Sequence, residues 1–224
     1  MRTIAYVDGY NLFFGCLKNT PYKWLDLVAL IESILRAQDP SSQLVRVRYF
    51  TAPIRAKLAS RGQAAAIAQD KYHRALAQRG RVDIIQGWYA LEGAWAPRKI
   101  DPPNKLDRVE IWRLEEKETD VNLALQLYRD AIRGECEQVV VVSSDSDLAP
   151  ALRLVESDAP AIRRGLIFPR GEVEGGSKQR PPNIGLSKLA HWTRQEIKNA
   201  ELAACQLPMR VPTNKKPIDK PDYW

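Results

Sequence analysis

Short apolar runs alternate along this chain with segments whose apolar residues recur every three or four positions. Runs of β-branched and aromatic residues predict buried strands, and the second spacing predicts amphipathic helices. Strands are predicted over residues 4–7, 44–52, 82–90, 139–142 and 163–168. Helices are predicted over residues 25–35, 63–78, 120–133 and 147–155. This order of elements predicts an α/β fold, with a mostly parallel five-stranded sheet between two layers of helices.

The remaining segments predict additions to this core. Residues 109–114 follow a proline-rich patch and indicate one strand of an inserted hairpin. Residues 186–204 predict a C-terminal helix. We expect a domain over residues 1–168, a basic loop and helix packed on it over 169–204, and a Pro/Lys-rich tail over 205–224. The tail is compatible with disorder or with docking on a partner or a second copy, so a homodimer stays open.

Charge is distributed unevenly along the 224 residues. Lys and Arg number 34 against 27 Asp and Glu, a net charge of +7. Residues 161–224 alone hold 12 basic and 6 acidic side chains, whereas residues 1–160 are nearly neutral. A basic end suggests a polyanionic partner, nucleic acid ahead of a membrane surface. A basic surface that only keeps the protein soluble explains the charge equally well.

Several classes of protein are disfavoured by what the sequence lacks. No apolar run approaches the roughly 20 residues of a membrane helix, and Met1 leads directly into a strand pattern without a signal peptide. Three widely spaced cysteines form neither a disulfide framework nor a zinc motif, so we expect a cytoplasmic protein. With only two histidines, a His-rich metal site or a Ser-His-Asp triad is disfavoured.

Acidic residues gather where the predicted sheet would bind a ligand. Asp8 follows the first strand, Asp145 and Asp147 follow the fourth, and Asp120 begins the helix before the fourth. In a sheet of this kind, ligands bind at the carboxyl ends of the strands where the winding reverses. Taken singly, Asp147 and Asp120 are ordinary helix-capping residues. Capping does not account for Asp8, and together the carboxylates predict a site for a hard cation, Mg²⁺ or Mn²⁺.

Three blocks around these residues, Tyr6–Leu12, Glu116–Val121 and Ser143–Pro150, carry a family resemblance. In order and spacing they resemble the NYN domain, the LabA-like branch of the PIN-like nuclease superfamily, over about residues 1–168. The resemblance implies a three-layer α/β/α PIN-like fold and metal-dependent ribonuclease activity. This chain has Glu118 and Ser144 where similar sequences often have glycine.

The resemblance also implies roles for individual residues. Asp8, Asp120 and Asp145 would be the metal-holding carboxylates, Asp147 a fourth acidic residue, and Asn11 a polar group near the scissile phosphate. A cation held there would activate a water molecule and neutralise phosphate oxygens. Ser143 and Thr119 offer hydroxyls to orient the carboxylates, although Thr119 is better explained as the N-cap of the helix over residues 120–133.

The basic end supplies candidates for substrate contact. Arg170, Lys178 and Arg180 lie in the loop after the fifth strand, and phosphate contacts of this kind bind RNA or DNA without reading sequence. Four aromatic residues near the insertion could stack on unpaired bases, but we expect most of them to pack the core or the hairpin: Trp88, Tyr89, Trp95 and Trp112.

The expected function is hydrolysis of phosphodiester bonds, most of all in RNA. The alternative is a PIN-like protein that binds RNA or regulates without cleaving it, and metal-dependent cleavage separates the two. A phosphatase with Asp8 as nucleophile is disfavoured because it expects an aspartate where Tyr10 stands. Dinucleotide binding is disfavoured because the first loop lacks the G-x-G-x-x-G pattern.

Overall fold

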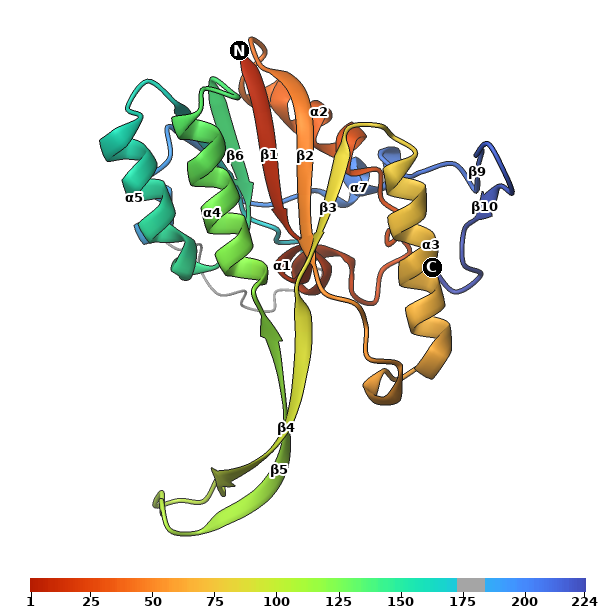
Figure 1. Cartoon of the computed structure of the whole chain (residues 1–224), viewed down its shortest axis with the longest axis vertical. Helices are drawn as coiled ribbons and strands as arrows, with labels where there is room; N and C mark the ends of the chain where they lie inside the picture. The colour runs from red at the N-terminus through yellow and green to blue at the C-terminus, as the bar shows by residue number, and fades with distance from the viewer. Residues whose placement is uncertain (173–183) are drawn as a thin grey trace.

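A computed structural model describes residues 1–172 and 184–224. Its centre is a six-stranded parallel sheet in the order β3-β2-β1-β6-β7-β8, with helices on both faces (Figure 1). The strands are β1 (Arg2–Asp8), β2 (Gln43–Thr51), β3 (Val82–Gln86), β4 (Trp88–Pro97), β5 (Arg108–Lys117), β6 (Gln138–Val142), β7 (Arg163–Ile167), β8 (Trp192–Arg194), β9 (Arg210–Val211) and β10 (Ile218–Asp219). The helices are α1 (Gly9–Leu12), α2 (Leu27–Gln38), α3 (Gly62–Ala77), α4 (Thr119–Ile132), α5 (Ala149–Asp158), α6 (Ile184–Ser187) and α7 (Asn199–Ala204), with a π-helical turn over Phe13–Leu17 and 3-10 turns over Ala56–Leu58 and Ser146–Leu148.

Strand β1 lies at the centre of the sheet, between β2 and β6. Val7 pairs with Val142 of β6, and Asp8 pairs with Phe50 of β2. The predicted α/β class with a mostly parallel sheet is therefore confirmed. The prediction of five strands is wrong, because β8 adds a sixth to the edge of β7.

Two apolar cores flank the sheet because successive residues of a strand point to opposite faces. Ile4 and Tyr6 of β1 pack against α4 and α5, and Ala5 and Val7 pack against α2 and α3. All five residues of β6 are buried, as expected for a parallel strand that is covered on both sides. This packing fixes the carboxyl ends of β1 and β6 side by side.

The predicted helix over residues 186–204 is wrong. The segment folds instead as α6, β8 and α7. Apolar residues recur here with helical spacing, but the free edge of β7 offers backbone hydrogen bonds that Trp192–Arg194 completes. Side chains reinforce the pairing: the Trp192 indole donates to Gln138 at 3.0 Å, and His191 accepts from the Arg164 backbone N–H at 3.0 Å. The predicted N-cap of α4 is also wrong, since the helix starts at Thr119 itself and Glu118 is the cap.

The predicted strand over residues 82–90 is divided at Gly87 into β3 and β4. A Cβ at Gly87 would lie 2.3 Å from the carbonyl oxygen of Lys117, so only glycine allows this close approach. Beyond this point β4 and β5 form a two-stranded antiparallel hairpin, confirming the predicted insertion. The hairpin extends away from the sheet, beyond the carboxyl ends of the strands (Figure 1).

Residues 205–224 lie against the body of the protein. Strands β9 and β10 pair with each other, and the Trp224 ring lies 6.3 Å from that of Trp24 and 5.4 Å from that of Tyr72. All three cysteines are buried as free thiols. Across residues 1–172 and 184–224, we find no helix with the length and apolar character needed to cross a bilayer.

Candidate active site

Asp8 ends β1 in a buried polar network. Its side chain is 1% exposed and accepts hydrogen bonds from the Asn11 backbone N–H at 2.9 Å and from the Ser143 hydroxyl at 2.8 Å. The Asn11 side-chain amide donates to its second oxygen at 2.5 Å. Burial raises the pKa of Asp8, whereas these hydrogen bonds oppose the rise. The network fixes the direction of the Asp8 carboxylate. Asp8 is also the N-cap of α1, so the expectation that capping does not account for it is wrong.

The loop after β6 is connected to the same network. The Ser143 hydroxyl, which donates to Asp8, also accepts from the Asp145 backbone N–H at 3.0 Å. Asp145 caps the 3-10 turn by accepting from the Asp147 backbone N–H at 2.9 Å. Asp147 is exposed to solvent. Two segments 135 residues apart in sequence are therefore joined at the carboxyl edge of the sheet.

Asp120, in the first turn of α4, faces these carboxylates. Its pKa is raised to about 6, first by partial burial and then by repulsion from Asp8, Asp145 and Asp147. Glu116, near the end of β5, has a raised pKa because of burial and the charge of Asp120. Five carboxylates from three distant segments thus lie close enough to repel one another.

The oxygen-only donor set fits a hard divalent cation, although the carboxylates do not form a finished metal site. Within the described ranges, no three acidic, His or Cys side chains converge closely enough to hold one ion. Asp8 is directed at Asn11 and Ser143, and Asp145 at its own turn. Glu116 Oε1 and Thr119 Oγ1 are buried with no hydrogen-bond partner among the described residues, and the Thr119 hydroxyl is near enough to favour the ionised Glu116. A cation would supply the counter-charge that this cluster lacks.

The structure describes two of the remaining predicted site residues, Asn11 and Arg170. Asn11 uses its amide N–H on Asp8 and its carbonyl on the Ser144 backbone N–H at 3.3 Å, so it holds the network together. Arg170 lies beside the π-helical turn after α1, because the next residue, Gly171, donates its backbone N–H to Gly15 at 3.0 Å. Lys178 and Arg180 lie outside the described residues.

Sequence reasoning missed three residues beside the carboxylates. Glu116 belongs to the second motif block, and its spacing of four from Asp120 is the signal that could have found it. Tyr10 and Phe14 are each 48% exposed, their rings 4.4 Å apart, in the segment that follows Asp8. The Lys18 ammonium lies 4.8 Å from the centre of the Phe14 ring. Two aromatic residues four positions apart, directly after Asp8 in the sequence, are the signal that could have found Tyr10 and Phe14.

The backbone explains one departure from the family pattern. Glu118 has a φ of 73°, the left-handed region in which glycine is unstrained, which accounts for glycine in similar sequences. In this chain the Glu118 carboxylate accepts a hydrogen bond from the Trp88 indole at 3.0 Å. That contact fastens the base of the hairpin to the start of α4. Nothing in the structure explains Ser144 in place of glycine.

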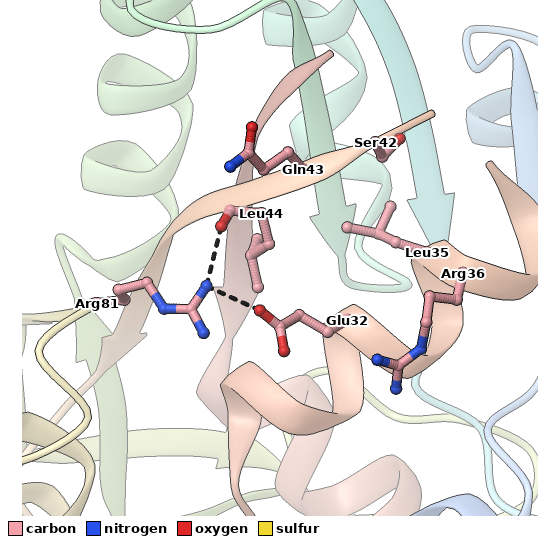
Figure 2. A pocket seen from close by; sticks show the side chains of 7 residues that line it. All are labelled: Glu32, Leu35, Arg36, Ser42, Gln43, Leu44 and Arg81. Carbon is pink, nitrogen blue, oxygen red and sulfur yellow. Dashed lines mark hydrogen bonds and ion pairs between the residues drawn. The ribbon is translucent and has the colours of Figure 1, made fainter. Parts of the chain in front are cut away.

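The amino end of the sheet is different in character. A hollow of about 320 Å³ lies there between α2 and the start of β2, far from the carboxylates along the strands (Figure 2). Arg81 crosses it, contacting Glu32 at 2.7 Å and the Leu44 carbonyl oxygen at 3.1 Å. Arg81 and Glu32 neutralise each other in this hollow and Arg36 is its other charged residue, so carboxylates do not crowd here as they do at the carboxyl edge.

Comparisons with known proteins show the family and the fold of the chain. The chain is 40% identical to 6-hydroxy-3-succinoylpyridine 3-monooxygenase HspA of Pseudomonas putida, over all of this chain and 75% of that protein. Its fold is similar to the crystal structure of a protein of unknown function, VPA0982, from Vibrio parahaemolyticus, with a TM-score of 0.51, 14% identity, and 88% and 93% of the two chains covered. The family model of the NYN domain matches residues 2–159. The chain therefore belongs to the NYN domain family, whose domain is PIN-like and nuclease-like.

Proposed function

We propose that this protein is a metal-dependent nuclease that hydrolyses phosphodiester bonds, with single-stranded or structured RNA as its substrate. One observation carries the proposal: five carboxylates gather at the carboxyl edge of an NYN domain, and among the described residues no Lys, Arg or His side chain forms an ion pair with them. Among the described residues, the ion pairs of the protein lie elsewhere, as those of Asp26, Asp39 and Asp130 illustrate. Crowded unpaired carboxylates raise the free energy of the protein until a cation binds.

Asp8, Asp120 and Asp145 would hold Mg²⁺ or Mn²⁺, with Glu116 and Asp147 at the edge of the site. When bound, the ion lowers the pKa of its water and neutralises phosphate oxygens. The protein contributes the fixed orientation of Asp8, which Asn11 and Ser143 impose by hydrogen bonding. With a pKa of about 6, Asp120 is mostly ionised at neutral pH and is available as a ligand.

The surface beside the carboxylates favours a polynucleotide with unpaired bases. Tyr10 and Phe14 present an exposed aromatic pair, and bases stack on such rings regardless of sequence. Lys18 places a positive charge over Phe14, and Arg170 lies near the same turn. We therefore propose Arg170, Lys178 and Arg180 as phosphate contacts, with cytoplasmic RNA as the partner and DNA as a second substrate to test.

A cleavage assay tests the proposal. Labelled single-stranded RNA, duplex RNA and single-stranded DNA are incubated with the protein and Mn²⁺, Mg²⁺ or EDTA. We expect metal-dependent cleavage that Asp8→Asn lowers by about 100-fold or more. The matched control is Asp39→Asn, a buried carboxylate paired with Arg163 at 3.0 Å at the other end of the sheet. Equal cleavage by wild type and Asp8→Asn would overturn the proposal, and RNA binding without any cleavage would support the non-catalytic alternative.

A second assay tests the basic residues. Charge reversal of Arg170, Lys178 and Arg180 together should weaken binding to single-stranded RNA and flatten its salt dependence. Unchanged affinity and an unchanged salt slope would remove these residues from the site.

The relative from Pseudomonas putida supports a second candidate function, oxygenation of a pyridine compound. A monooxygenase inserts one atom of dioxygen into its substrate and reduces the other to water with two electrons from a reductant. The exposed pair Tyr10–Phe14 would also stack on a pyridine ring. The test measures oxygen uptake by the protein with 6-hydroxy-3-succinoylpyridine as substrate and a reduced nicotinamide dinucleotide as electron donor. Substrate-dependent uptake that Asp8→Asn abolishes, in a protein that cleaves no nucleic acid, would replace the nuclease proposal.

A further inference from the structure

Large apolar side chains gather on the β4–β5 hairpin, away from both cores. The two strands pair only with each other, and they project beyond the sheet (Figure 1). Contrary to the expectation of packing, Trp88, Trp95 and Trp112 are 46%, 57% and 73% exposed. The expectation fails because the hairpin leaves the body of the protein, so no helix covers it.

Four of the six large exposed apolar residues of β4 and β5 lie on one face of the hairpin. Leu91 pairs with Leu114, Gly93 with Trp112, and Trp95 with Glu110. Cross-strand partners share a face, and residues two apart along a strand return to it. Four large side chains therefore form one apolar face: Leu91, Trp95, Trp112 and Leu114, exposed by 39%, 57%, 73% and 45%.

The opposite face of the hairpin is mixed: it carries Trp88 and Ile111, 46% and 37% exposed, among small and charged residues. Its cross-strand pairs include Glu92 with Arg113 and Ala94 with Ile111. A two-stranded ribbon is at best marginally stable in water by itself, and a contiguous exposed apolar surface marks an interaction site. The larger exposed apolar surface is therefore on the face of Leu91, Trp95, Trp112 and Leu114.

The charges of the hairpin favour a protein partner over a nucleic acid. Residues 88–117 carry six basic and six acidic side chains, so they present no net positive charge to a polyanion. Several of these charges pair locally, such as Arg98 with Asp107 and Arg113 with Glu115. On the apolar face itself, Arg108 and Glu110 stand two residues apart with opposite charges.

We propose that the apolar face of the hairpin binds the same face of a second copy of this chain. A twofold axis requires a self-complementary surface. The apolar face meets this requirement, because its apolar side chains cover their counterparts while Arg108 of each copy meets Glu110 of the other. Tryptophan side chains contribute disproportionately to such interfaces, so Trp95 and Trp112 form the centre of the contact. The proposed dimer does not rest on the proposed nuclease activity.

The test is the mass in solution, measured by light scattering or sedimentation between about 1 and 100 µM. We expect wild type to associate to twice the chain mass of 25.4 kDa. Trp95→Thr combined with Trp112→Thr keeps a strand-forming residue at both positions and should yield a monomer. The matched control Ile111→Thr, on the other face of the same strand, should remain a dimer. Circular dichroism and melting temperature verify that each variant is folded.

Charge exchange adds a test that does not remove apolar surface. Arg108→Glu or Glu110→Arg alone should weaken the dimer about 10-fold, and the two substitutions in one chain should restore it. A wild type that stays monomeric at 100 µM, a double Trp variant that stays dimeric, or a charge pair that is not restored would each overturn the proposal. If the double Trp variant keeps its mass and instead loses affinity for single-stranded RNA, the apolar face binds nucleic acid and not a second copy.

Discussion

Two aspartates of helix α4 lie in very different electrostatic environments, one at each end of the helix. Asp130, in the last turn of α4, is 1% exposed, accepts from the Tyr6 hydroxyl at 2.8 Å and pairs with the Arg48 guanidinium at 2.6 Å. Asp120, in the first turn, meets three other aspartates, and its pKa rises to about 6. The more deeply buried carboxylate is the better compensated one.

The comparison separates charges that are paired within the fold from charges that have no cationic partner among the described residues. At the amino end of the sheet, Arg163 pairs with Asp39 and Arg81 with Glu32. At the carboxyl end, Asp8, Glu116 and Asp120 have no cationic partner among the described residues. The like charges at the carboxyl end add nothing to stability, and this supports the proposal that they serve to bind a ligand.

Asp130→Asn should give the largest change in stability. Removing one partner of a buried ion pair leaves Arg48 and the Tyr6 hydroxyl poorly matched, and the free energy of unfolding should fall by about 3 kcal/mol. Urea unfolding measures the change. Activity per folded molecule should stay close to that of wild type, and a stability change below about 1 kcal/mol would contradict the structural role of Asp130.

Glu116→Gln should weaken metal binding about 10-fold, because it removes one charge and one free oxygen from the cluster. Titration calorimetry with Mn²⁺ and the metal dependence of cleavage both report the effect. Glu115→Gln is the matched control, since Glu115 neighbours Glu116 on the other face of β5 and pairs with Lys117 at 2.5 Å. Equal effects of the two variants would show that only net charge matters at this edge.

Asp120→Asn should stabilise the protein in EDTA, opposite in sign to Asp130→Asn. The carboxyl group has a pKa of about 6 in the folded state against an ordinary value of 3.8 for aspartate, so folding disfavours its charged form. In the wild type, the loss of stability caused by the ionised Asp120 carboxylate is absent below pH 3.8 and complete above about pH 6. We expect a gain of about 1 kcal/mol at pH 8, reduced by solvent screening, that disappears by pH 4. Melting temperatures from pH 4 to pH 8 decide this, and a gain that is independent of pH would exclude the charge mechanism.

Much of the body could be predicted because one sequence pattern and one packing rule determined it. Val139–Val142 is apolar without interruption, as a strand covered on both faces must be, and β6 lies there. That strand and the run over residues 4–7 were enough to predict that Asp8 lies close to the Asp145 loop. In the structure the Ser143 hydroxyl joins the two by donating to Asp8. The predicted strand over residues 109–114 likewise falls within β5.

The features that were missed depend on tertiary contacts. The edge of β7 converts Trp192–Arg194 from an expected helix into a strand, and no local pattern reports that a free edge is available. Trp95 and Trp112 look like core residues from composition alone, because exposure depends on where the hairpin projects. Glu116 was missed for a related reason: a carboxylate at the end of a strand gains its role only from the neighbours that the fold brings to it.

Arg81→Met should give the smallest effect. Its ion pair with Glu32 is 39% and 35% exposed, and such pairs contribute about 0.2–1 kcal/mol that salt screens. The methionine side chain retains much of the apolar contact beside Leu44 but loses the hydrogen bond to the Leu44 carbonyl oxygen. We therefore expect the free energy of unfolding to fall by less than about 1 kcal/mol, and by less still in 1 M salt. A double-mutant cycle with Glu32→Gln should show that the two substitutions are coupled.

Cleavage of RNA should be unchanged, since the hollow in Figure 2 lies at the amino end of the sheet, away from the carboxylates. A 10-fold loss of cleavage without loss of stability would mean that this neutralised end also binds substrate, and the division between structural and ligand-binding charges would fail.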